Sequence, residues 1–254
     1  MEKYELPLVF FTVLSQMSVG MALVLTWRTL RGEVEGHFYW LATGLVLALA
    51  SIAAILHLAH PDRAYDALIN LRHAWLSREI LGATLFGAAV GVTFLAKGHK
   101  AMALIASVFG VLLVAVQGMT YAAPAMVAIA NGFTMLLFFI TVWVMGCAAI
   151  PLLKLRPAVP ALRQGIVVCI AVLIAAPLVW LSGGTVMQMT ARSWLASPFY
   201  LASLVCLALA FVASRHGDSR PKRLFVLLFV GVFLSRLVFF GDTVSTIVNI
   251  GHLY

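Results

Sequence analysis

The sequence predicts an all-α integral membrane protein, a bundle of eight transmembrane helices whose two termini lie on the same side of the membrane. Three observations predict this fold: 63% of the 254 residues are hydrophobic, only 10% are charged, and the mean hydropathy is +1.05. A soluble domain carries about a quarter of its residues as charged ones. Each bilayer crossing needs about 20 consecutive apolar residues, and the uncharged runs supply that length several times. The composition therefore excludes an ordinary soluble globule.

Charged residues divide the chain into the apolar runs that we interpret as membrane spans. Helices are expected because lipid leaves the polar groups of a backbone no partner outside their own segment. The longest run without a charge extends over residues 101–153, and the turn-prone stretch 120–132 divides it into two. A single transmembrane domain, 1–254, is expected, with spans at roughly 6–27, 38–58, 80–96, 101–119, 132–153, 164–181, 195–213 and 224–248.

Lysine and arginine residues predict the orientation of these spans. The loops that follow odd-numbered spans hold eleven of them, whereas the other loops and the N-terminal segment hold five. Cytoplasmic loops carry the excess of positive charge, so we expect both termini outside the cell. The net charge of +8 could suggest a nucleic-acid partner, but the basic residues form no patch with interleaved aromatic residues. No nucleic-acid partner is expected.

The stretch between the second and third spans carries the most informative polar residues. His57 lies near the outer end of the second span, and Ser77 is interpreted as the cap of the third helix, which places Glu79 in its first turn. The imidazole of His57 and the carboxyl group of Glu79 thus lie on either side of the loop that joins the second and third spans. Simpler interpretations stay open: a helix dipole favours glutamate in a first turn, a boundary histidine can serve as an anchor, and Arg63 can contact lipid headgroups.

The sequence gives no ligand set for a metal or heme. The three cysteines, Cys147, Cys169 and Cys206, are far apart in the chain. Of the seven histidines only His57 falls within a span, whereas a heme held by two histidines needs one on each of two helices. We therefore expect neither heme nor metal in this chain.

Arg236 lies inside the last span, and Asp242 follows six residues later. An arginine in the middle of a span costs about 2.5–3.5 kcal/mol on the insertion scale and should face the protein interior. The two residues do not share a helix face. Arg236 is expected either to satisfy backbone carbonyls or to serve a polar ligand.

In the third span, the four-residue spacing of Ala83, Gly87 and Gly91 predicts close helix packing.

Several motifs resemble those of a known family. They are Glu5 to Leu14 with Gln16 and Gly20, then Leu56-His57-Leu58 followed by Pro61, Arg63-Ala64 and Leu68, then Leu76-Ser77-Arg78-Glu79-Ile80, and more weakly Asn131 with Phe138 to Thr141. In order and spacing the chain resembles the membrane-anchor (C) subunit of bacterial anaerobic dimethyl sulfoxide reductases. That family has eight spans with both termini on the periplasmic side.

The resemblance implies a place in anaerobic respiration at the bacterial inner membrane. Such anchors hold an iron–sulfur subunit and a molybdopterin catalytic subunit in a heterotrimer, oxidise menaquinol and pass the electrons to the iron–sulfur subunit. The quinol-site histidine and glutamate of the family fall on His57 and Glu79 here, and its loop arginine falls on Arg63. Tyr65 stands where the relatives carry Phe, which leaves the terminal electron acceptor open.

We therefore expect menaquinol among the outer ends of the second and third spans. His57 would bind one ring hydroxyl, since an imidazole titrates near neutral pH, and Glu79 would accept or relay a proton. Further contacts with the quinol are assigned to Arg63, Tyr65, Tyr121, Asn131 and Arg236. Three alternatives remain: a secondary transporter that uses Arg236 and Asp242, an anchor of the polysulfide-reductase type, and a purely structural anchor.

Overall fold

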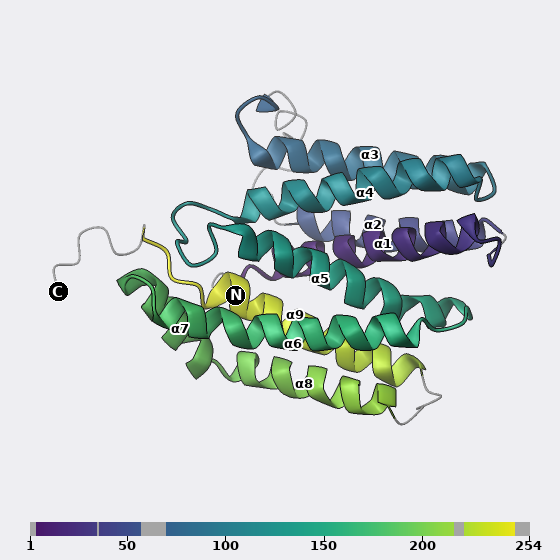
Figure 1. The fold of residues 1–254 in the computed structure, drawn as a ribbon. Coiled ribbons are helices and arrows are strands. Elements are labelled where there is room, and N and C mark those ends of the chain that lie inside the picture. Colours follow the sequence, from purple (N-terminus) through teal and green to yellow (C-terminus); the bar gives the residue numbers. More distant parts are fainter. Residues whose placement is uncertain (1–3, 35, 57–69, 216–220, 247–254) are drawn as a thin grey trace.

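The computed structural model describes residues 4–34, 36–56, 70–215 and 221–246, and every regular element in these ranges is a helix (Figure 1). Eight of the helices are long and apolar enough to cross a membrane, so the expected all-α architecture with eight candidate spans is confirmed. The elements are α1 (Leu6–Leu30), α2 (Phe38–Ile55), α3 (Trp75–Leu95), α4 (Lys100–Tyr121), α5 (Gly132–Ala149), the 3-10 turn η3 (Ile150–Leu153), α6 (Val159–Leu181), α7 (Thr185–Ala196), α8 (Pro198–Arg215) and α9 (Pro221–Gly241).

The long helices run up and down through the bundle, each antiparallel to the one before it (Figure 1). We call the end where α1 begins and α9 ends the terminal end. Burial distinguishes the helices: in the most apolar stretch of each helix, 72% of the α1 residues and 67% of the α5 residues are buried, against 22% for α2. Helices α1 and α5 therefore form the centre of the bundle, and α2 lies at its periphery.

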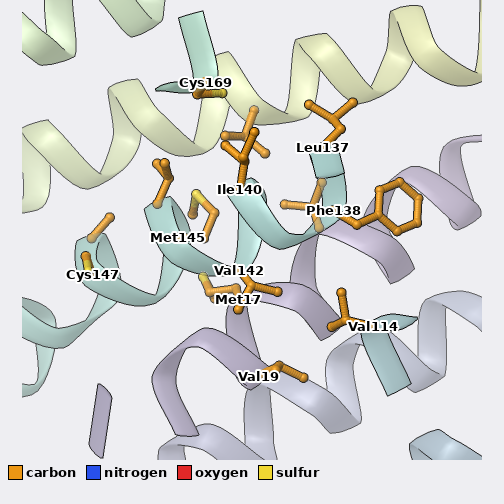
Figure 2. Close-up of a cluster of buried hydrophobic side chains, with 14 of the residues drawn as sticks. Met17, Val19, Val114, Leu137, Phe138, Ile140, Val142, Met145, Cys147 and Cys169 are labelled. Atoms are coloured by element: carbon orange, nitrogen blue, oxygen red, sulfur yellow. The ribbon is translucent and has the colours of Figure 1, made fainter. Parts of the chain in front are cut away.

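The contact between α1 and α5 is close. Figure 2 shows Met17 of α1 beside Val142 of α5, within one cluster of buried apolar side chains that also includes Val19. At Gly20, an added Cβ would lie 2.1 Å from the carbonyl oxygen of Val142, and at Gly146 it would lie 2.5 Å from the carbonyl carbon of Gly20. Small residues allow helix backbones to approach in this way, which matters in lipid because van der Waals packing drives helix association there.

Helix α3 begins earlier than the sequence predicts. Its first residue is Trp75 and its N-cap is Ala74, so the interpretation of Ser77 as the cap is wrong, and Glu79 lies in the second turn. The predicted boundary followed the charges at Arg78 and Glu79, but Arg78 is accommodated at the helix start. Its guanidinium donates to the carbonyl oxygens of Leu71 and Arg72 and lies 4.3 Å from the Trp75 ring centroid.

A short helix and the end of α9 depart from the expected seventh and eighth spans. Helix α7 precedes α8 as a separate element at the terminal end (Figure 1), and α9 stops at Gly241. The segment after α9 hydrogen-bonds across that end instead of continuing as helix: the Val244 amide donates to the Thr190 hydroxyl at 3.2 Å, and the Thr246 amide donates to the Ala125 carbonyl at 2.8 Å. These contacts hold α7 and the α4–α5 connection over the terminal end.

Candidate functional site

A cavity of about 740 Å³ lies mainly between α2 and α3, and Leu8 and Phe11 from the start of α1 also line it. This volume is within the range of small-molecule sites. Its lining is almost entirely apolar and extends along both helices, from Trp40 and Phe94 at one end to Ile55, Leu76 and Glu79 at the terminal end. The cavity is therefore a long apolar groove with its acidic residue near the terminal end.

Few of the described lining residues offer a polar group to a ligand. The hydroxyl groups of Ser51 and Thr84 donate to carbonyl oxygens of their own helices, at Leu47 (3.0 Å) and Ile80 (2.8 Å). Glu79 of α3 and Tyr121, the last residue of α4, are the other lining residues with polar side-chain ends, apart from the Trp40 indole at the far end. Polar contacts with a ligand would concentrate at Glu79 and Tyr121.

The Glu79 side chain is only 1% exposed, and neither carboxyl oxygen has a hydrogen bond of full geometry within the described residues. Tyr121, Gln117 and Thr120 of α4 face it. Burying a carboxyl group without a partner is costly, and ionisable residues inside a membrane mark functional sites. Glu79 thus presents its carboxyl oxygens at the end of a cavity, beside polar groups of α4, as a ligand-binding carboxyl group would.

The Tyr121 ring is held by aromatic neighbours. Its centroid lies 5.8 Å from that of Phe138 in α5 and 5.3 Å from that of Phe240 in α9, the latter edge to face. These contacts fix the ring so that its hydroxyl faces Glu79. Tyr121 and Glu79 therefore lie together at the terminal end of the cavity.

Three of the expected site residues, His57, Arg63 and Tyr65, lie outside the described residues. Ile55, at the end of α2 and two positions before His57, lines the cavity together with Glu79. The backbone thus leaves the described part of α2 at the same end of the cavity as the carboxyl group.

Asn131 does not line this cavity. It is the N-cap of α5: its carboxamide oxygen accepts from the Phe133 amide at 2.9 Å, and its carboxamide nitrogen donates to the Ala128 carbonyl at 3.0 Å. Both ends of the amide are therefore used within the α4–α5 connection, in the usual manner of an asparagine N-cap.

Arg236 of α9 is completely buried, as a charge in the middle of a span should be. One of its terminal nitrogens donates to Gln16 Oε1 at 3.0 Å and to Thr141 Oγ1 at 2.9 Å, so these bonds go to side chains and not to backbone carbonyls. The guanidinium also lies 4.2 Å from the Phe138 ring centroid. Arg236 is not among the residues lining the cavity.

Sequence reasoning missed two glutamines. Gln16 of α1 and Gln117 of α4 are both completely buried and hydrogen-bond each other at 3.3 Å. They stand between Arg236, which bonds Gln16, and Glu79, which Gln117 faces. The sequence did contain a signal for them, because each is an amide side chain inside an otherwise apolar span.

The small residues Ala83, Gly87 and Gly91 of α3 all line the cavity, and not all of them pack closely against a neighbouring helix. An added Cβ at Gly87 would meet Leu47 of α2 at 3.3 Å, but one at Gly91 would have no atom of the described residues within 4 Å. The predicted close packing thus holds at Gly87 and fails at Gly91, which borders open space.

A second groove of about 380 Å³ lies between α1, α5 and α6 at the opposite end, with Trp27 and Trp143 among its lining residues. Among the described residues, no acidic side chain lines it, and Cys147 is the one titratable side chain in its lining. Among the residues that the structure describes, no group of three or more His, Cys, Asp or Glu could hold a metal ion.

Comparison with known proteins finds a family that matches most of the chain. The family described as "DMSO reductase anchor subunit (DmsC)" matches residues 1–242. The protein is 29% identical to the C subunit of the anaerobic dimethyl sulfoxide reductase of Haemophilus influenzae over 152 residues, 55% of its own length and 54% of the relative. It is 32% identical to YnfH of Escherichia coli, an anaerobic dimethyl sulfoxide reductase subunit, over 160 residues, 56% and 55% of the two proteins. The matched stretch thus spans about half the length of each relative.

Proposed function

Because the chain belongs to the family of dimethyl sulfoxide reductase anchor subunits, we propose that it binds menaquinol in the cavity between α2 and α3 and oxidises it there. The electrons pass to an iron–sulfur subunit, which supplies a molybdopterin catalytic subunit in the same heterotrimer. One observation carries the proposal: a buried carboxyl group, whose oxygens make no hydrogen bond of full geometry within the described residues, stands near one end of a long apolar cavity.

The cavity fits the chemistry of a quinol. Menaquinol has an aromatic ring with two hydroxyl groups and a long apolar tail. Glu79 and Tyr121 offer hydrogen bonds to a ring hydroxyl, and the apolar lining that leads along α2 and α3 toward Trp40 and Phe94 suits the tail. The ring would then lie at the terminal end of the bundle, with the tail along the groove.

The reaction removes two electrons and two protons from the ring hydroxyls. In this proposal the Glu79 carboxylate accepts one proton as the O–H bond of the quinol breaks, and Tyr121 orients the carboxyl group. His57 serves the other hydroxyl, supported by the position of Ile55 at this end of the cavity, and Arg63 and Tyr65 belong to the same segment. His57 accepts the second proton, both electrons leave for the cluster of the partner subunit, and quinone is released. Glu79 and His57 then release their protons to the outside, which returns the protein to its starting state.

The distribution of charge supports an orientation in the bacterial inner membrane. Basic residues gather at the end opposite Glu79: Arg28, Arg31, Lys97, Lys100, Lys154, Arg156, Arg163, Arg215, Lys222 and Arg223. At the terminal end the described residues include Arg72, Arg78 and Arg192. By the positive-inside rule the terminal end is periplasmic, so protons from the quinol are released on that side.

Substitution of Glu79 tests this function. We expect Glu79→Gln to abolish menaquinol-dependent reduction by the assembled complex, and His57→Ala to do the same, while reduction driven by an artificial donor to the partner subunits continues. Glu33→Gln makes the same change in an exposed residue beyond the other end of α1 and should leave both activities unchanged. Normal menaquinol oxidation by the assembled Glu79→Gln complex would refute the proposal.

A further inference from the structure

A series of side-chain hydrogen bonds leads from Arg236 toward Glu79 through the core of the bundle. Arg236 Nη2 donates to Gln16 Oε1 at 3.0 Å, and Gln16 Nε2 donates to Gln117 Oε1 at 3.3 Å. Gln117 Nε2 donates to Ser15 Oγ at 2.9 Å, and the same side chain faces the Glu79 carboxyl group. Four helices, α9, α1, α4 and α3, thus contribute in turn to one polar connection.

The direction of this connection follows from the residue types. Arginine has donors and no acceptor, so Gln16 must turn its oxygen toward Arg236 and its nitrogen toward Gln117. Gln117 must then turn its oxygen toward Gln16, which leaves its N–H groups for Ser15 and Glu79. Neither amide can be reversed without placing donor against donor, so the side facing Glu79 is a donor side.

Hydrogen-bond donors that face Glu79 favour its ionised carboxylate form, which only accepts hydrogen bonds. The guanidinium stays protonated in proteins, and in a medium of low dielectric successive hydrogen bonds polarise one another. The positive end of each amide dipole points toward the carboxyl group. The connection therefore stabilises the ionised carboxylate over the protonated acid, although the charge itself stays on Arg236.

Other groups near this connection are few among the described residues. Tyr121 of α4 faces both Glu79 and Arg236, and the Cys169 thiol of α6 faces Arg236. From α5, Thr141 and Phe138 contact the guanidinium and do not titrate. Two nitrogens of Arg236, Nε and Nη1, have no hydrogen-bond partner in the described part of the protein, so Gln16 shares the guanidinium with only one other acceptor there, the Thr141 hydroxyl.

We infer that Arg236 is a positioning residue that, through Gln16 and Gln117, holds Glu79 ready to accept the proton of the bound quinol. This inference rests on the proposed function. Arg236 keeps its own protons throughout, and the transferred proton moves from the quinol oxygen to a Glu79 oxygen. The site thereby uses a cation that never touches the substrate.

The pH dependence of quinol oxidation tests this role. The rate is measured in the complete complex with a soluble reduced naphthoquinol as the donor. We expect Gln117→Leu and Gln16→Leu to move the acidic limb of the pH–rate profile to higher pH by about one unit. At a given acidic pH this shift corresponds to about a tenfold loss of rate. Thr141→Val removes the other hydrogen bond of the same Arg236 nitrogen and should leave the profile in place.

An infrared measurement reads the carboxyl group directly. The band of protonated Glu79, identified by its loss in Glu79→Gln, should be stronger at neutral pH in Gln117→Leu than in the wild type. An unchanged band and an unchanged pH profile in assembled Gln117→Leu would overturn the inference. If Glu79→Gln itself oxidises quinol, the proposed function fails. If Glu79→Gln is inactive but Gln16→Leu and Gln117→Leu behave as the wild type, the proposed function stands and the inferred role of Arg236 is wrong.

Discussion

Gly20 of α1 and Gly146 of α5 meet backbone to backbone at the centre of the bundle. An added Cβ at Gly146 would lie 2.5–2.6 Å from three backbone atoms of Gly20, and one at Gly20 would collide with the Val142 carbonyl. Neither neighbour is a flexible side-chain end, so no rotamer change could relieve the contact. The two most buried helices are therefore held at a distance that a methyl group would increase.

Gly20→Ala should accordingly destabilise the protein. Overpacking of a core costs about 1–3 kcal/mol, and here the α1–α5 contact must open. Thermal unfolding in detergent should show a lower midpoint for Gly20→Ala and for Gly146→Ala. Gly132→Ala is the matched control, since an added Cβ at Gly132 would have no atom within 4 Å in the part of the chain that the structure describes. Equal midpoints for Gly20→Ala and Gly132→Ala would show that this contact does not limit the packing.

Asn131→Ala should reduce stability without weakening quinol binding. Asn131 is the N-cap of α5, and removal of an asparagine N-cap costs about 1 kcal/mol. Asn131→Ser keeps a capping oxygen and should recover most of the unfolding midpoint. The KM for quinol should stay at the wild-type value in both variants. A raised KM in the stable Asn131→Ser protein would instead place Asn131 in the quinol site.

Gly91→Phe should obstruct the tail of the quinol. Gly91 borders the groove with no atom near its missing side chain, so a benzyl group would enter the space assigned to the tail. We expect the KM for long-tailed menaquinol to rise, with little change for a tail-less naphthoquinol. Val92→Phe adds the same ring at the adjacent position, which is 48% exposed and does not line the cavity. Similar kinetics in both variants would argue against the tail path.

Tyr121→Phe should slow quinol oxidation and leave the fold intact. The ring contacts with Phe138 and Phe240 do not need the hydroxyl. A hydrogen bond to a charged group is worth about 1.5–3 kcal/mol, so the rate should fall by roughly one to two orders of magnitude. Steady-state rates with menaquinol and with an artificial donor separate this effect from a loss of assembly. Tyr121→Phe with the full menaquinol rate would remove Tyr121 from the mechanism.

The eight spans could be predicted because charges interrupt apolar runs, and this pattern does not depend on which helices touch. The ends of the helices were harder to predict from the sequence. Arg78 and Glu79 suggested an interface, yet both lie inside α3, since Arg78 reaches back to backbone carbonyls and Glu79 turns into the bundle. Helix α7 was not anticipated because its sequence, with Gln188 and Arg192, is neither apolar enough for a span nor typical of a loop.

The site was predictable in part for a related reason. A carboxyl group beside a span is conspicuous in a sequence with so few charges, so Glu79 stood out, and Tyr121 followed from its place at the same membrane face. The connection from Arg236 through Gln16 and Gln117 joins positions 101 and 220 residues apart in the sequence. Such pairs follow from which helices are neighbours, and no local pattern contains that information.

Photolabelling with an azido-naphthoquinone tests the central claim most directly, because it locates the ring without assuming its chemistry. Peptide mapping of the illuminated complex should place the label on the residues of α2 and α3 that line the cavity near Glu79, within 48–55 and 76–88, and excess menaquinol should suppress it. Label confined to the second groove, at Trp27 and Trp143, or label that menaquinol does not suppress, would contradict a quinol site between α2 and α3.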